Sequence, residues 1–380
     1  MTPALDRNAF EVTANYVYLN HAAVGVLPVR ARDALTKFVA EHAAGGVMGA
    51  WHYEARLPEY RAAVAGFIGA LPGDIALLRN TGDGANVIGA GLDWSAGDEI
   101  LTNDNEFPSN AYPWLACRHF GAHVRFIDTS KERMTPDVLR AHITKRTRVV
   151  AVSWVGFNDG YRHDLAALAE VAHEAGALFC VDVIQGLGAF PLDVVGCNID
   201  AAYGGGAKWL MSLQGVSFLY VSPALRDRLR LAAPRWRSAS DMWDFLNYDQ
   251  PAVDDATRFE GGTPNIIGGL SMAESIAVLQ PAAAIAEHVL ALTDHLYEGL
   301  AKLGARVASL RGPGISSGIV TFEIPGCDSV ALGKLLQQER IVTTYRSSGV
   351  RVSPHGYNTV EELDRLLQVT AQALPVLQSA

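Results

Sequence analysis

Paired cysteines and basic runs are both missing from this sequence. The four cysteines, Cys117, Cys180, Cys197 and Cys327, show no paired spacing, which indicates reduced thiols and a cytoplasmic protein rather than a disulfide framework. The 31 Lys and Arg residues are outnumbered by 40 Asp and Glu, so the net charge is −9. No run of basic residues could follow a phosphate backbone, and we therefore expect no nucleic-acid partner.

Long apolar stretches are missing as well. The run at 147–155 has the length of a strand, far short of a membrane span. The N-terminal residues 1–10 are charged and lack the apolar centre of a signal peptide. The sequence therefore predicts neither a membrane segment nor a secretory leader.

Several common catalytic motifs are also missing. The 36 glycines include no Gly-Lys-Ser/Thr of a P-loop, and neither 82–89 nor 204–206 has the spacing of a dinucleotide-binding loop. No Gly-x-Ser-x-Gly elbow supports a serine hydrolase. His119 and His123 are four residues apart, but His123 begins a predicted strand, so we expect no helical metal pair and no metal ion.

The sequence does contain a regular alternation of strand-like and helix-like segments. An amphipathic, Ala/Leu-rich stretch at 164–175 predicts a helix that ends at Gly176. Strand–helix–strand alternation predicts an α/β fold with a mostly parallel sheet between helices. The predicted strands of this sheet include 99–102, 123–127, 149–154 and 178–183.

The pattern changes after residues 261–264, where a smaller α+β domain is predicted. At 380 residues the chain is too long for one core, because single cores stop growing beyond roughly 250–300 residues. We expect three parts: an N-terminal segment (1–17) packing with the small domain, a large domain (18–265) and the small C-terminal domain (266–380). The predicted elements of the small domain are a helix at 267–303, strands at 319–323 and 350–352, and a closing helix at 360–377.

Three short segments carry groups suited to a phosphorylated, carbonyl-bearing ring. Asp182 ends an apolar strand, and strand ends in an open α/β sheet face the ligand crevice. Lys208 follows among small and apolar residues, where desolvation favours the neutral amine. Thr81 and Gly82 begin a helical stretch whose N–H groups suit a phosphate. Each feature alone has a simpler explanation as a cap, a salt bridge or a surface lysine, but their order and spacing point to one site.

In these residues the sequence resembles the class V aminotransferases of the fold-type I pyridoxal 5'-phosphate (PLP) enzymes, which include cysteine desulfurases, isopenicillin N epimerase-like proteins and kynureninases. The resemblance runs from 18–23 to 351–359, and its most specific pieces are 181–185, 208–210, 258–265 and the segment that begins at Arg351. It implies a fold-type I PLP-dependent transferase that forms a homodimer with shared active sites.

The resemblance also implies roles at the cofactor ring. Lys208 would hold PLP as a Schiff base and then move the Cα proton of the substrate. Asp182 would bond the pyridine N–H and Gln185 the phenolic oxygen. Phe107 falls where relatives stack an aromatic ring on the cofactor, and Asn158 lies in a loop near the cofactor.

Phosphate and substrate contacts are implied in the same way. Thr81 and the Gly82 backbone would hold the phosphate, helped by Thr263 from the neighbouring subunit. Arg351 would form a bidentate contact with the substrate carboxylate, and His21 is expected at the substrate side.

Two departures from the family pattern bear on function. Many relatives place Ser and His shortly before the lysine, where this chain has Gly205 and Ala207, so backbone groups or Thr263 must compensate. Desulfurases need a nucleophilic cysteine shortly before the carboxylate-binding arginine, and the stretch 343–349 has none. Cys327 lies in a turn-like context that does not suit that role.

The implied activity is PLP chemistry on a small α-amino acid. Aminotransferase-type chemistry is our first expectation, with a C–S (β-elimination) lyase or a cysteine desulfurase-like enzyme as the alternative and an epimerase behind both. A different class of protein, a non-catalytic PLP-fold binding protein, is suggested by the missing Ser and His. The presence of Lys208, Asp182 and Arg351 argues against it, because a scaffold has no use for a reactive lysine.

Overall fold

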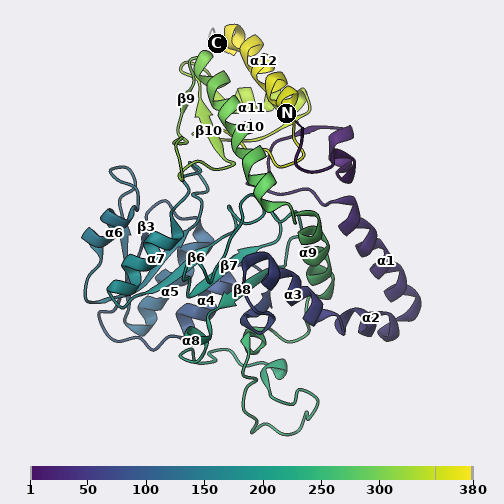
Figure 1. Cartoon of the computed structure of the whole chain (residues 1–380), viewed down its shortest axis with the longest axis vertical. Helices are drawn as coiled ribbons and strands as arrows, with labels where there is room; N and C mark the ends of the chain where they lie inside the picture. The colour runs from purple at the N-terminus through teal and green to yellow at the C-terminus, as the bar shows by residue number, and fades with distance from the viewer. Residues whose placement is uncertain (1, 347, 378–380) are drawn as a thin grey trace.

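The chain folds into a large α/β unit and a smaller unit beside it (Figure 1). The computed structural model describes residues 2–346 and 348–377. The helices are α1 (Val29–Gly45), α2 (Val47–Glu54), α3 (Leu57–Ile68), α4 (Thr81–Gly91), α5 (Tyr112–Ala116), α6 (Pro136–His142), α7 (Leu165–Glu174), α8 (Pro223–Arg226), α9 (Ile266–Val278), α10 (Ala282–Lys302), α11 (Ser329–Gln338) and α12 (Val360–Leu377). The strands are β1 (Val17–Tyr18), β2 (Ile75–Leu78), β3 (Glu99–Asn103), β4 (His123–Ile127), β5 (Thr147–Ser153), β6 (Leu178–Asp182), β7 (Ala201–Gly205), β8 (Ser217–Val221), β9 (Arg306–Val307), β10 (Val320–Glu323), β11 (Ile341–Val342), β12 (Thr344–Arg346) and β13 (Gly349–Val352).

The large unit is built on a seven-stranded sheet with the strand order β2-β8-β7-β6-β5-β3-β4. β8 runs antiparallel to both of its neighbours, β2 and β7, and the other pairs are parallel. The predicted α/β fold with a mostly parallel sheet is confirmed. The predicted strands are also confirmed to within two residues at each end.

Helices cover both faces of this sheet, so its central strands are buried on both sides. Val150 and Val152 of β5 pack into one core with side chains of α3 and α7. The alternate residues Val149 and Ala151 pack into a second core with side chains of α4 and α5. This two-sided burial explains the continuous apolar runs in the sequence, because a strand with one solvated face would alternate with polar residues.

Helix α7 begins and ends at residues whose local chemistry can be recognised in the sequence. Its N-cap Asp164 accepts a hydrogen bond from the Ala167 N–H (3.2 Å), which satisfies a free donor of the first turn. Gly176 follows the helix with a φ of 76°, a left-handed conformation that glycine adopts without steric penalty. The predicted helix and its predicted end are both confirmed.

The predicted long helix at 267–303 is wrong, because it is broken into α9 and α10. The break lies between Val278 and Ala282, and the two helices meet at 76°. α9 packs on α1 and α3 of the large unit, whereas α10 packs on α12 of the small one. The boundary between the large and the small unit therefore lies nearer to the break between α9 and α10 than to residue 265. Among the described residues no single helix is long and apolar enough to cross a membrane, although the bent pair α9–α10 passes that test when taken together.

The small unit joins the two ends of the chain. Its four-stranded sheet has the order β12-β13-β10-β9, and β1 from the N-terminal segment pairs in parallel with β11. The N-terminal segment lies beside the turn before α12, where the Leu5 N–H donates to the Gly356 carbonyl oxygen (3.0 Å). The predicted strands at 319–323 and 350–352 and the closing helix at 360–377 are confirmed as β10, β13 and α12.

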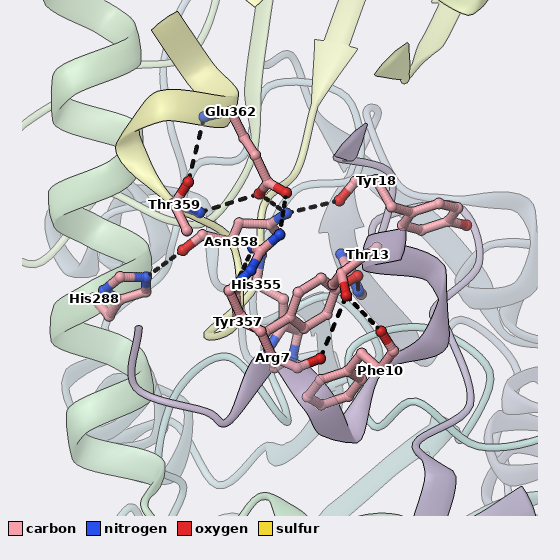
Figure 2. A network of polar contacts seen from close by, with 11 residues as sticks. Arg7, Phe10, Thr13, Tyr18, His288, His355, Tyr357, Asn358, Thr359 and Glu362 are labelled. Atoms are coloured by element: carbon pink, nitrogen blue, oxygen red, sulfur yellow. Dashed lines mark hydrogen bonds and ion pairs between the residues drawn. The ribbon is translucent and has the colours of Figure 1, made fainter. Parts of the chain in front are cut away.

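A polar network fastens the N-terminal segment to the turn before α12 (Figure 2). Arg7 donates to the Tyr357 carbonyl oxygen (2.7 Å) and to a carboxylate oxygen of Glu362 (2.8 Å). The other Glu362 oxygen accepts from the Asn358 amide (2.8 Å), which also donates to the Tyr18 carbonyl oxygen (3.1 Å). The Phe10 ring stacks on the Tyr357 ring, with centroids 4.3 Å apart. These contacts fix the turn that follows β13.

Three buried histidines make stability depend on pH. Burial lowers the pKa of His163 and of His355 to about 4, and it lowers the pKa of His21 well below its usual value. The unfolded chain binds protons on these rings at about pH 6.5, whereas the folded protein does not, so the contribution of these rings to stability is full above that pH and is lost as the pH drops towards 4.

We therefore expect the thermal unfolding midpoint to fall steadily between pH 7 and pH 5, as measured by circular dichroism. The exposed His119 provides the control, because His119→Gln should leave this slope unchanged. A midpoint that stays flat over this window would show that the buried rings are not the groups that couple stability to pH.

Candidate active site

Asp182 and Lys208 are brought close together at the carboxyl end of the sheet. Asp182 is the last residue of β6 and is 1% exposed. Its carboxylate accepts a hydrogen bond from the Ile184 N–H (2.9 Å) and has no ion pair within the described part of the chain. Lys208 lies in the loop that follows β7.

The two groups change each other's pKa although they do not form an ion pair. Burial raises the pKa of Asp182 to about 7, with Lys208 acting in the opposite direction. Burial lowers the pKa of Lys208 to about 8, against the attraction of Asp182 and together with the repulsion of Arg351. At neutral pH a larger fraction of this amine is therefore neutral than in an exposed lysine, which favours its use as a nucleophile and base.

The backbone around Lys208 is held by close contacts. The Gly25 N–H donates to the Ala207 carbonyl oxygen (2.7 Å), and a Cβ at Gly25 would come within 2.0 Å of the Lys208 carbonyl oxygen. Trp209, which is 1% exposed, has its carbonyl oxygen 3.1 Å from Nε2 of His355 in the small unit. The loop that carries Lys208 is therefore held in place by contacts with Gly25 and with His355.

Two phenylalanine rings and an arginine lie next to the lysine. The Lys208 Nζ is 5.1 Å from the centroid of the Phe107 ring, and the Phe157 ring meets Phe107 edge to face at 5.3 Å. Arg351 donates from Nη1 to the Phe157 carbonyl oxygen (2.7 Å). Phe157 was missed from the sequence, because its neighbour Asn158 looked like the functional residue of that loop.

Arg351 is a buried cation without an anion. It is 9% exposed, its Nε has no hydrogen-bond partner, and no carboxylate pairs with it among the described residues. Burial and, to a smaller extent, the charge of Arg346 lower the pKa of Arg351 to about 10. A guanidinium in this state favours an incoming carboxylate, which would restore its lost solvation.

The start of α4 meets the lysine loop through Thr81. The N-cap Asn80 accepts from the Asp83 N–H (3.0 Å), so the first turn is fixed and its other N–H groups point out of the helix end. Thr81 Oγ1 accepts from the Gly205 N–H (3.0 Å), and its own O–H remains available to donate. A Cβ at Gly205 would lie 3.3 Å from Thr81 Oγ1, so a larger residue there would require Thr81 to shift by a few tenths of an ångström.

Gln185 and His21 are more occupied than the sequence suggested. The Gln185 amide donates to the Ala22 carbonyl oxygen (3.0 Å) and accepts from the Trp209 indole N–H (3.0 Å), which leaves one amide N–H. The His21 ring nitrogens lie 3.2 Å from the Ser353 carbonyl oxygen and 3.1 Å from the Tyr357 hydroxyl. His21 therefore has no free ring nitrogen for a substrate, and its contacts brace the small unit instead.

Asn158 and Thr263 lie away from the lysine of their own chain. Asn158 is exposed and lines an open pocket of about 370 Å³ with Arg133. Thr263 is exposed and lines a cavity of about 430 Å³ with Arg235, and Lys208 is not part of that lining. The structure therefore does not bring Asn158 to the cofactor position predicted for it, because its loop presents the Phe157 carbonyl to Arg351 and leaves the next side chain outside.

No reactive thiol is found in the described part of this site. Cys117 and Cys180 are buried, Cys197 and Cys327 are partly buried, and burial raises the pKa of all four thiols. Thiols with raised pKa values stay protonated at neutral pH and are poor nucleophiles. Within the stretch 343–349, Ser347 lies outside the described residues.

The residues present fit PLP. A buried carboxylate without a cation suits the protonated pyridine nitrogen, and an amine with a lowered pKa suits the aldehyde carbon. The O–H of Thr81 and the free N–H groups at the start of α4 suit a phosphate. The described residues contain no group of His, Cys, Asp and Glu suited to a metal ion.

Comparisons with known proteins identify the family of this chain. The sequence profile of the family "Aminotransferase class-V" matches residues 17–366. A probable cysteine desulfurase of Methanothermobacter thermautotrophicus is 27% identical over 95% of both chains, and an uncharacterised aminotransferase of Bacillus subtilis is 28% identical over 79% of both. An apo cysteine desulfurase from Thermococcus onnurineus has the same fold, with a TM-score of 0.88 at 24% identity over 98% of both chains.

A second solved structure extends the range of activities found on this fold. The cystine C–S lyase C-DES, in complex with cysteine persulfide, superposes with a TM-score of 0.88 at 24% identity over 95% of this chain and 99% of its own. Because the family profile covers nearly the whole sequence, the chain belongs to the class V aminotransferase family of PLP-dependent enzymes.

Proposed function

We propose that this enzyme transaminates a small α-amino acid, with Lys208 as its base. The observation that supports the proposal most strongly is the buried pair of Asp182 and Lys208. Each shifts the pKa of the other, although the two do not form an ion pair. When bound, PLP supplies an electron-accepting ring that makes the Cα proton of an amino acid removable. The chain's own task is to orient the substrate and to move that proton.

Each group of the site has a part in this task. Asp182 accepts the pyridine N–H, and the remaining N–H of Gln185 donates to the phenolic oxygen. Thr81 and the Gly82 N–H hold the phosphate at the start of α4, and Phe107 covers one face of the ring. Asn158 is left out of this set, because its side chain is exposed in a different pocket.

Arg351 binds the substrate carboxylate. Its guanidinium already donates to the Phe157 carbonyl oxygen, which fixes its direction, and its Nε has no partner. A planar carboxylate can take two parallel N–H bonds from such a group. This contact holds the Cα of the substrate in place next to Lys208.

A single base favours some outcomes over others. Phe107 and Phe157 carry no proton, so no side chain in this pair could exchange one on a second face of the substrate. Epimerisation requires a base on each face, whereas transamination needs one base that moves a proton from one carbon to the next. The missing thiolate argues against sulfur transfer to the protein.

β-Elimination from a sulfur-containing amino acid is the second candidate. It also needs one base, and it releases the sulfur group without a protein thiol. The relatives named as probable cysteine desulfurases support a cysteine-like substrate.

A homodimer completes the proposed site. The exposed Thr263 faces a cavity of about 430 Å³ that lies apart from Lys208, which suits a residue that serves the neighbouring subunit. The segment 236–251 extends below the large unit in Figure 1 and carries exposed aromatic side chains, among them Trp243 (59%), Phe245 (61%) and Tyr248 (89%). Exposed apolar groups in such number are typical of a protein interface.

Product analysis tests the proposed reaction. Incubation with a panel of small amino acids and a 2-oxo acid should give a new amino acid and a new 2-oxo acid in equal amounts, and the Lys208→Ala variant should give neither. The exposed Lys302 provides the control, because Lys302→Ala should keep full activity. If cysteine alone, with no 2-oxo acid added as amino-group acceptor, gives pyruvate and sulfide, the result would contradict transamination and favour elimination.

The Arg351→Ala variant should raise the KM for the amino acid roughly 10- to 100-fold, which is the range expected for a lost hydrogen-bonded charge pair. PLP content, measured by absorbance, should stay at one equivalent per chain, because the arginine does not hold the cofactor. Arg306→Ala is the matched control, since Arg306 is an exposed arginine at the edge of the same sheet. Unchanged kinetics in the Arg351 variant would remove this residue from the substrate site.

A further inference from the structure

Asp182 stands between two polar neighbours in the sheet. It pairs in register with Ser153 on β5 and with Tyr203 on β7. Side chains that pair in register project to the same side of a sheet, so all three lie in one row. This row ends at the place where the proposed PLP ring meets the aspartate.

Glu106, in the loop after β3, is joined to both neighbours of Asp182. One of its carboxylate oxygens accepts from the Ser153 N–H (2.8 Å), and the other accepts from the Ser153 hydroxyl and the Asn110 amide (2.9 Å). The Asn110 oxygen in turn accepts from the Tyr203 hydroxyl (2.6 Å). Glu106 was missed from the sequence, because only the neighbouring Phe107 matched a known position.

The donors around Glu106 suit an ionised carboxylate. The Ser153 N–H, the Ser153 hydroxyl and the Asn110 amide all donate, and none of them requires a proton on Glu106. Burial raises the pKa of Glu106, and these hydrogen bonds oppose that shift. Glu106 also affects Asp182, whose pKa is raised mainly by burial and, to a smaller extent, by the nearby Glu106.

Four titratable groups affect one another near this row: Glu106, Asp182, Lys208 and Arg351. Asp182 is influenced by Glu106 and Lys208, and Lys208 is influenced by Asp182 and Arg351. The pKa of Tyr203 is raised well above its usual value, chiefly by burial, so this hydroxyl stays protonated and can keep donating. Within this row, Asp182 is therefore the carboxylate that acts on the amine, and Glu106 is the carboxylate that acts on Asp182.

We infer that Glu106 is a positioning residue of the PLP site, which braces the row of Ser153, Asp182 and Tyr203 and adds a second negative charge behind the aspartate. The inference rests on the proposed placement of PLP between Asp182 and Lys208. A second carboxylate favours the cationic forms of the pyridine nitrogen and of the Lys208 nitrogen that binds the cofactor. The same contacts hold the start of the loop that presents Phe107 to the lysine.

The test uses the holoenzyme and the Glu106→Gln variant, which keeps an oxygen acceptor but loses the charge. The pH midpoint of the visible cofactor absorbance should move down by roughly 0.5–1 unit, because removal of a nearby negative charge makes a cation easier to deprotonate. The Kd for PLP, measured by fluorescence titration, should rise less than about tenfold. Glu106→Ala should show the same shift with a larger loss of affinity, because the bonds to Ser153 and Asn110 are lost as well.

Glu99→Gln is the matched control, because Glu99 is a carboxylate at the opposite end of the adjoining strand β3 that is bonded to Arg125 and Thr144. It should leave the midpoint unchanged. If the Glu106→Gln variant loses thermal stability or affinity for PLP while the pH midpoint of the cofactor absorbance stays unchanged, the inference is overturned. Glu106 would then have only a structural role. A wild-type protein that stays colourless with added PLP would overturn the proposed function itself.

Discussion

The interaction between Asp182 and Lys208 is the constraint on which the rest of the structure depends. Both groups are taken out of water, and neither is neutralised by direct contact with the other. Removing charges from water without pairing them is unfavourable, so the fold must hold them in place by other means. A cationic ring with an aldehyde at its opposite side would satisfy both groups at once, and this explains why the protein maintains the arrangement.

The surrounding fold supplies the required rigidity. Asp182 sits on a central strand buried on both faces, and Lys208 sits on a loop whose backbone touches Gly25. The small unit reaches this loop through His355 and carries Arg351 four residues earlier on β13. The network in Figure 2 fastens the following turn to the N-terminal segment, so the distance between the lysine and the arginine is fixed by contacts from three parts of the chain.

Much of this could be predicted from the sequence, and the failures share a physical cause. The apolar runs of β3 to β6 and the cap of α7 are local signals, and they placed Asp182 at a strand end. The antiparallel direction of β8 and the 76° break before Ala282 depend on packing between distant segments. The same holds for the functional loop, where a difference of one residue separates the exposed Asn158 from Phe157, whose carbonyl binds Arg351. His21 packs against Trp209, the residue after Lys208, but its hydrogen bonds to the small unit are tertiary contacts that no motif encodes.

The most direct measurement is chemical trapping of the bond between the cofactor and the chain. Borohydride reduction of the PLP-loaded protein fixes the cofactor on the amine that holds it, and peptide mass spectrometry then locates the added mass. The account predicts one modification per chain, on the peptide that contains Lys208. A modification on another lysine, or none in a protein that binds PLP, would contradict it.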